Sequence, residues 1–457
     1  MASTSSELPP LKRGGGIQFS VVLPVLFYEY LAISLTRSLI PRMIVAEFGD
    51  YSYLAVGVME TIKGILAFIS CPAFGRLSDR IGRKYCLLVT VTGSTLPVCI
   101  LAFTNNMYIF AVVMSLSGFF SATFPLTFAY ISDCVDKKNR APAYGLALAT
   151  FGLSFCLGPL SGSYLAEQFS SQAVFLTSLA LVVVNIFYIV MYLPETVKHA
   201  GATVSFAGSS LHNLTGVAME YLPNTWNIAE TFRVFSLDPF MTNLAAIVFL
   251  YYTSVWAIVS TLMVYVTRHL HFEPVTLGWL LSGYGFATMF SEGVLVRIIV
   301  PYLGETNSMR LGLVAFAIQC IVVAFSTSSE WIFVSVLFSM FANLVYPSIS
   351  SLVSKIVEED MQGEALGALN GIKALTEGFG PLLFGFLMGL FEKAAIPGAP
   401  YLVASFLSFW AFLHCYELPP EPELVTAKHS AIRKGAEEGD SLLHNEGGGS
   451  ADSNDTF

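Results

Sequence analysis

Charged residues are scarce in this chain of 457 residues: Asp, Glu, Lys and Arg together make up 12% of it, about half the share in ordinary soluble domains. Hydrophobic residues make up 54%, more than a soluble core can bury without leaving an apolar surface that aggregates. A soluble enzyme is therefore excluded. The net charge of −9 excludes a nucleic-acid binder as well, since phosphate contacts need an excess of basic residues. The composition predicts a multi-pass membrane protein embedded in the lipid bilayer.

Motifs of several other protein classes are missing. None of the seven cysteines forms a CxxC pair, so neither a disulfide framework nor a zinc site is indicated. The phosphate-binding GxxxxGK[ST] motif does not occur, so any transport would be secondary rather than driven by ATP. The sequence predicts no metal, no cofactor and no enzymatic activity.

Long apolar runs divide the chain into two sets of six. A helix needs about 20 apolar residues to cross a bilayer, and the sequence offers twelve such runs with one central interruption. We expect a cytosolic tail at 1–16, a six-helix bundle at 17–196, a cytosolic loop at 197–240, a second bundle at 241–418, and an acidic disordered tail at 419–457. The predicted spans are 17–46, 52–74, 85–104, 107–132, 141–165, 172–193, 241–267, 275–299, 309–326, 330–354, 364–389 and 400–416.

The orientation follows from the basic residues. They gather before the first span and in the loops after the second and fourth, whereas the loops after the first, third and fifth spans hold little more than Arg42. Because basic loops stay in the cytosol, we expect both termini and the central loop to be cytosolic.

The two halves repeat at one constant offset in residue number. Gly permits close contact between helices, and Pro bends a helix inside the membrane. Two bundles with matching kinks are typical of a transporter with a substrate site near the membrane midplane. A duplicated membrane scaffold remains the alternative at this point. The matched positions are Gly82 and Gly304, Pro125 and Pro347, Gly145 and Gly367, Gly158 and Gly380, and Pro159 and Pro381.

The loop between the second and third spans carries a dense motif. Residues 75–84 read Gly-Arg-Leu-Ser-Asp-Arg-Ile-Gly-Arg-Lys, and include Gly75, Asp79, Arg80, Gly82 and Arg83. This loop resembles the signature of the major facilitator superfamily, where it latches the two halves on the cytosolic side. An aspartate at this place can accept hydrogen bonds from a helix N-terminus, and we expect Asp79 to do so. In the second half, Pro301 stands where Asp79 would be repeated, which predicts a vestigial counterpart.

The fifth span points to a branch of that family. Its Gly152, Gly158, Pro159 and Gly162 resemble the motif of drug–proton antiporters. Residues 192–196 also resemble a stretch common in that branch. Within the branch, residues 128–133, 351–355 and 362–363 look most similar to the hippocampus-abundant-transcript-like group, which is itself similar to the tetracycline antiporters. One departure matters: Met114 occupies the place of the arginine that those antiporters use in proton transfer, so their proton path does not carry over.

Charges inside the predicted spans are candidates for function because they are costly in a membrane. Glu60 and Lys63 are three residues apart and Lys373 and Glu377 four apart, so each pair lies on one helix face. A gating role and simple mutual neutralisation remain equally open for these two pairs. Asn343, on the tenth span, is the polar group that we expect to face the cavity.

Glu29 and Arg37 on the first span stand apart from these pairs. Eight residues separate them, about 12 Å along a helix, and neither has an opposite charge one turn away. The resemblance places the first span on the central cavity. We therefore expect Glu29 to load and release a proton and Arg37 to hold an anionic group, the alternative being that both pair with other helices. Glu292 is a weaker candidate.

The resulting prediction is an all-α major facilitator fold that moves a small organic solute by alternating access, as a monomer. Proton coupling, or uniport without it, stays open. The alternative from another class is a transporter-shaped sorting receptor. It is favoured by the tail, where Glu438, Leu442 and Leu443 fit an acidic dileucine signal that sorting adaptors bind. The membrane would be endolysosomal, vacuolar or the plasma membrane.

Overall fold

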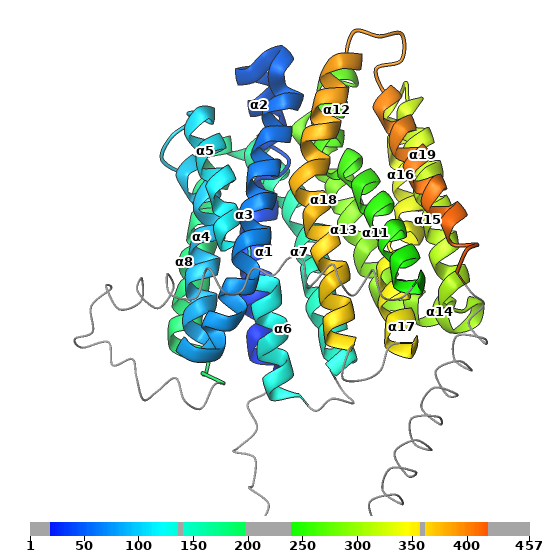
Figure 1. The fold of residues 1–457 in the computed structure, drawn as a ribbon. Coiled ribbons are helices and arrows are strands. Elements are labelled where there is room, and N and C mark those ends of the chain that lie inside the picture. The colour runs from blue at the N-terminus through cyan, green and yellow to red at the C-terminus, as the bar shows by residue number, and fades with distance from the viewer. Residues whose placement is uncertain (1–18, 136–139, 197–238, 357–361, 419–457) are drawn as a thin grey trace, which may run out of the picture. The chain divides into compact units, whose positions relative to one another are not determined.

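The computed structural model describes residues 19–135, 140–196, 239–356 and 362–418, which are helical with short connections and contain no strand (Figure 1). The helices of the N-terminal half are α1 (Leu23–Thr36), α2 (Ile40–Phe48), α3 (Ser52–Ile81), α4 (Arg83–Leu101), α5 (Met107–Ser117), α6 (Thr123–Cys134), α7 (Arg140–Gln168) and α8 (Ser171–Tyr192). Those of the C-terminal half are α11 (Pro239–Trp256), α12 (Leu262–His269), α13 (Pro274–Phe290), α14 (Val296–Leu303), α15 (Glu305–Ala324), α16 (Ser329–Ala342), α17 (Val345–Ile356), α18 (Gln362–Phe391) and α19 (Ala399–His414).

The described helices confirm a multi-pass membrane protein. Eleven helical stretches are long and apolar enough to cross a membrane, and the shorter apolar helix α19 corresponds to the twelfth predicted span. The first span differs from its prediction as one helix over 17–46, because α1 ends at Thr36 and α2 begins only at Ile40. Pro41 explains the break, since proline has no backbone N–H to continue the hydrogen-bond ladder of α1.

The chain divides into two compact units. Unit 1 comprises residues 1–225 and 263–289, and unit 2 comprises 226–262 and 290–457. The segment 263–289 was expected in the second bundle, but its helix α13 packs against α7 of unit 1. Two glycines permit this approach, since a Cβ atom at Gly278 or Gly285 would collide with α7.

The internal repeat is present in the helices themselves. Gly82 and its repeat equivalent Gly304 both adopt a positive φ, of 117° and 80°, directly before a helix begins. Helix packing repeats too: α1 contacts α7 and α8 in unit 1, and the equivalent α11 contacts α18 and α19 in unit 2. Five helix starts coincide at the same offset: Ser52 and Pro274, Arg83 and Glu305, Met107 and Ser329, Thr123 and Val345, and Arg140 and Gln362.

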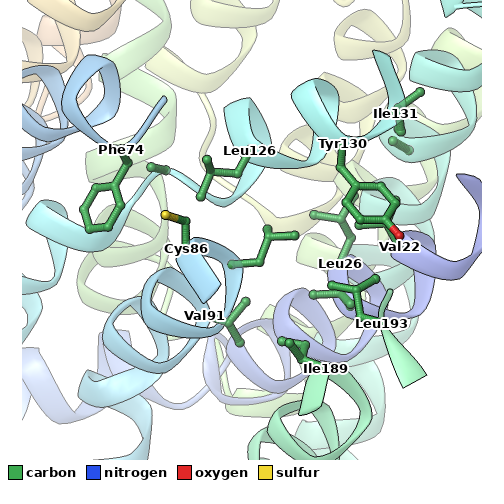
Figure 2. Close-up of a cluster of buried hydrophobic side chains, with 14 of the residues drawn as sticks. Val22, Leu26, Phe74, Cys86, Val91, Leu126, Tyr130, Ile131, Ile189 and Leu193 are labelled. Carbon is green, nitrogen blue, oxygen red and sulfur yellow. The ribbon is translucent and has the colours of Figure 1, made fainter. Parts of the chain in front are cut away.

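A cluster of apolar side chains forms the core of unit 1 (Figure 2). Leu26 of α1, Val91 of α4, Leu126 of α6 and Ile189 of α8 meet there, and each is fully buried. Lipid tails are as apolar as these side chains. The side chains therefore stabilise the fold through close van der Waals packing rather than through exclusion of water. The core fixes the relative positions of the three helices, α1, α4 and α6, that carry the polar site described next.

Several predicted features lie outside the described residues. These are the N-terminal tail at 1–16, the loop residues 197–238, the tail at 419–457, and with it the sorting-signal residues Glu438, Leu442 and Leu443.

Candidate functional site

Glu29 lies inside unit 1, where it is 1% exposed. Its Oε1 accepts hydrogen bonds from the Ser94 hydroxyl of α4, at 2.6 Å, and from the Thr123 hydroxyl of α6, at 3.0 Å. Its Oε2 is buried and has no hydrogen-bond partner among the described residues. One carboxyl group thus joins three helices and keeps one oxygen unpaired in the interior.

Unit 2 has no carboxyl group at the equivalent position. Tyr251 stands there, and its hydroxyl donates to the carbonyl of Ala342 at 3.0 Å. Phe316, which is equivalent to Ser94, contacts the Tyr251 ring with centroids 5.4 Å apart. In unit 2, ring packing and one hydrogen bond to a backbone carbonyl therefore stand where unit 1 has a buried acid held by two hydroxyl groups.

Glu60 and Lys63 of α3 form the pair that their spacing predicted, with Glu60 Oε2 3.4 Å from the ammonium of Lys63. Arg37 adds a smaller electrostatic attraction to the same carboxylate. Its predicted role of holding an anionic group stays a prediction. Glu29, in contrast, is held by hydroxyl groups.

Lys373 of α18 lies between two aromatic rings of unit 2. Its ammonium is 4.9 Å from the ring centroid of Tyr252 and 5.0 Å from that of Tyr346. Glu377 attracts Lys373 as the spacing predicted, and Glu292, from the π-helical turn Ser291–Leu295, does so as well. Asn343 lies at the break between α16 and α17, three residues before Tyr346.

The predicted latch centres on Arg83, whose side chain is only 9% exposed. Its guanidinium contacts Asp79 Oδ1 at 2.5 Å and Asp133 Oδ2 at 3.1 Å, and it also donates to the Ser78 hydroxyl. Asp133 in addition accepts from Thr196 at 3.0 Å. Asp79 thus binds the guanidinium of the first residue of the next helix, rather than the helix N-terminus that we expected.

Glu195 is the carboxylate that caps a helix in this region. It accepts the backbone N–H groups of Arg83, at 2.8 Å, and of Lys84, at 3.1 Å, which are the first two of α4. These N–H groups have no partner within the helix and carry its positive dipole end. Sequence reasoning missed this role, although residues 192–196 had already stood out as a family motif.

The loop of unit 2 that corresponds to residues 75–84 has a different sequence, but it still forms an ion pair. Glu305 follows Gly304 at the start of α15, and its Oε1 lies 2.6 Å from the Lys355 ammonium and 2.9 Å from the Ser351 hydroxyl. Pro301, which stands where Asp79 would be repeated, lies inside α14.

The glycines of the kink motif mark close helix crossings. A Cβ atom at Gly158 or Gly162 would collide with residues 34 and 35 of α1, and one at Gly152 would crowd Met289 of α13. In unit 2, a Cβ atom at Gly380 would strike Trp256. Pro159 and Pro381 lie inside α7 and α18. The motif therefore serves helix contact, while Gly75 has free space around it.

A polar cluster that the sequence did not indicate lies at the N-terminal end of α3. Arg268 of α12 contacts Asp50 Oδ1 at 3.1 Å and Ser52 Oγ at 3.0 Å, and also donates to the carbonyl of Gly49. Helix α3 has 30 residues and is therefore about 45 Å long. One ionic cluster thus lies at each end of this helix, the other being that of Asp79 and Arg83.

In the described part of the chain, eleven long apolar helical segments and the shorter α19 fall into two repeated sets with buried charges on them, which is the arrangement of a polytopic membrane transporter. The family model described as "Major Facilitator Superfamily" matches residues 22–265 and 244–445, and the chain belongs to that family. It is 27% identical to human (Homo sapiens) hippocampus abundant transcript-like protein 1 over 434 residues, which cover 90% of this chain and 83% of that protein. It is 25% identical to the Escherichia coli tetracycline resistance protein, class E, over 80% of this chain and 87% of that protein.

Solved structures share the fold. The human organic anion transporter MFSD10 (TETRAN) superposes with a TM-score of 0.61 at 19% identity, covering 87% of this chain and 98% of that one. A mutant of the peptide transporter POT in complex with alafosfalin gives a TM-score of 0.67 at 14% identity, covering 89% and 95%. The major facilitator fold is thereby confirmed, and the protein is a secondary transporter.

Proposed function

We propose that the protein exchanges a small organic solute for protons across its membrane, and that Glu29 is the group that carries the proton. The observation that carries this proposal is the buried Glu29 carboxyl, which joins α1, α4 and α6 and has one oxygen without a partner among the described residues. Buried ionisable groups in membrane spans are functional candidates because hydrocarbon does not solvate them.

The geometry suggests how protonation would act on the helices. As an anion, Glu29 accepts from Ser94 and Thr123 through Oε1, while Oε2 lacks the donor that a buried charge needs. As a neutral acid, it carries a proton on one oxygen and can donate to a new acceptor. Each state favours a different set of contacts of α1 with α4 and α6, so proton binding would bias the helix packing and with it the side of the membrane that is open.

Two facts support exchange with protons rather than another coupling. The relatives of this chain include proteins named for tetracycline resistance, and the glycine–proline motif of α7 resembles that of drug–proton antiporters. Met114 stands in place of the arginine of those antiporters and packs against the apolar cluster around Leu39 and Phe110. The proton path proposed here therefore depends on Glu29 and its hydroxyl partners.

The experiment uses the purified full-length protein in liposomes with a panel of organic cations, anions and peptides as probe solutes. We expect Glu29→Gln to abolish uptake driven by a pH gradient but to keep solute exchange without a gradient, because the amide preserves shape and cannot carry a proton. Glu60→Gln is the comparison variant. Glu60 is neutralised by Lys63 at 3.4 Å, so a loss of uptake through gating in this variant should persist without a pH gradient, unlike the loss expected for Glu29→Gln. Unaltered pH-driven uptake by Glu29→Gln would contradict the proposal.

The tail motif and the charge distribution lead us to propose an endolysosomal or vacuolar membrane with cytosolic termini. Replacing Leu442 and Leu443 with alanine should shift the protein to the cell surface, as seen by fluorescence microscopy. An unchanged distribution would contradict the signal and, with it, the alternative of a sorting receptor. The glycosylation sequon at Asn213 should remain unmodified, and a glycan there would overturn the orientation.

A further inference from the structure

The surroundings of Lys373 form a cage built from three helices of unit 2. Tyr252 of α11 and Tyr346 of α17 present their rings at 4.9 and 5.0 Å from the ammonium. The hydroxyl of Tyr346 donates to Asn370 Oδ1 at 3.2 Å, which ties this ring to α18, one turn before Lys373. Aromatic faces within about 6 Å of a cation attract it through the ring quadrupole.

The charges around this cage favour a cation. Glu377 lies one helical turn after Lys373 on α18, and Glu292, in the turn Ser291–Leu295, is the second carboxyl group whose charge favours the ionised ammonium. With all three charged groups ionised, the cluster has two negative charges against one positive charge. An anionic ligand would be attracted only by the Lys373 ammonium, whose charge the two carboxylates already neutralise. A cationic ligand would be attracted by both carboxylates and by both ring faces.

The internal repeat shows that the place between the two rings accepts different occupants. At the offset that relates Gly82 to Gly304, Tyr30 and Phe124 in unit 1 are equivalent to the two tyrosines. Phe151 occupies the place of Lys373, with its ring 4.8 Å from that of Tyr30 and 5.4 Å from that of Phe124. The same backbone frame thus holds a third ring in unit 1 and an ammonium in unit 2.

The cage can be reached from outside the protein. Lys373, Tyr346, Glu377 and Glu292 are all partly exposed, and Tyr252 is 9% exposed. Charged side chains in membrane spans face the protein interior or water rather than lipid, so a water-soluble ligand has access to these groups.

We propose that the Tyr252–Tyr346–Glu377–Glu292 cluster is a binding site for a monovalent organic cation, such as a quaternary or protonated amine, and that the ammonium of Lys373 occupies it as a tethered competitor. A ligand must displace the lysine, which acts at the high effective concentration of a linked group and therefore weakens apparent affinity. This inference rests on the proposed transport function, for which it names the class of solute.

The test measures binding of choline to the full-length protein in detergent micelles, with the neutral analogue 3,3-dimethyl-1-butanol as reference. We expect Lys373→Ala to bind choline at least ten-fold more tightly than wild type, because the competitor is gone. Lys373→Arg should bind like wild type, and the neutral alcohol should show no such gain. Adding Tyr346→Ala to Lys373→Ala should weaken choline binding about 3- to 30-fold, the worth of one desolvated ring face.

The proposal is overturned if Lys373→Ala binds choline no more tightly than wild type does. It is also overturned if the affinity for the neutral alcohol rises by the same factor, because the variant would then only have created room for a ligand of that size. A second measurement needs no variant: choline should increase reductive methylation of Lys373 in the wild-type protein, with Lys63 as internal reference. Unchanged labelling of Lys373 also overturns the proposal. Since no gradient is involved, these outcomes are independent of the Glu29→Gln transport result.

Discussion

Glu305 and Lys355 form an ion pair of 2.6 Å in unit 2, at the positions that Arg83 and Asp133 occupy in unit 1 with the charges exchanged. In both units the pair joins the first residue of the helix after a positive-φ glycine to a helix two further along the chain. The repeat has therefore kept the interaction while losing the residues that made it recognisable. Opposite charges satisfy the same geometry in either order, which is why the motif disappears from the sequence but not from the structure.

Exchanging the charges of this pair tests the equivalence. Glu305→Lys and Lys355→Glu should each lower the free energy of unfolding, because each places like charges side by side. The double variant should recover the coupling of about 1 kcal/mol expected for a pair in which Lys355 is 48% exposed. The free energy of unfolding of the double variant should still be about 0.5 kcal/mol lower than that of wild type, since the helix dipole stabilises an acid at the first turn and destabilises a base there. Chemical unfolding in mixed micelles gives these values, and a double variant no better than the singles would contradict the equivalence.

Asp79 and Arg83 should respond differently to replacement, although they contact each other. Asp79 is 59% exposed, so Asp79→Ala should cost under about 1 kcal/mol of stability while slowing solute turnover in liposomes. Arg83→Ala should cost more, about 2–3 kcal/mol, because it leaves Asp133 without its buried cation. Wild-type turnover of Asp79→Ala would contradict a role for this residue in the transport cycle.

The cap of α4 offers a third prediction. Glu195→Ala removes the acceptor of two backbone N–H groups and should lower the free energy of unfolding by about 1 kcal/mol. Glu195→Gln should cost less, because the amide oxygen still accepts. Glu167, an exposed acid of α7, is the matched control, and Glu167→Ala should leave stability within about 0.5 kcal/mol of wild type. Equal effects of the two alanine variants would show that the cap contributes nothing.

Two glycines of α7 provide a matched pair. A Cβ atom at Gly162 would collide with the backbone of Leu35, so Gly162→Ala should push α1 away and cost about 1–3 kcal/mol. Gly145 has nothing within 4 Å of a Cβ atom, and Gly145→Ala should leave stability unchanged or raise it by up to about 1 kcal/mol. The comparison is made by unfolding in micelles. A harmless Gly162→Ala would mean that α1 and α7 do not depend on this contact.

The membrane class, the helical segments and the internal repeat could be read from the sequence alone. Hydropathy is a property of local composition, so a run such as 172–193 predicts α8 almost to the residue. The break after Thr36 was missed because α1 and α2 are both apolar, so that hydropathy does not separate them and only Pro41 marks the boundary. The Glu60–Lys63 pair was accessible too, since three residues on a helix fix its geometry.

Only the tertiary structure decided which groups meet across helices. Glu29 finds Ser94 and Thr123 at separations of 65 and 94 residues, and Lys373 finds rings on α11 and α17. These helices are apolar around most of their circumference, because some faces meet lipid and others meet protein of the same polarity. Periodicity therefore cannot tell which face points inward. The sequence determined that charges enter the membrane, and packing determined what each of them contacts.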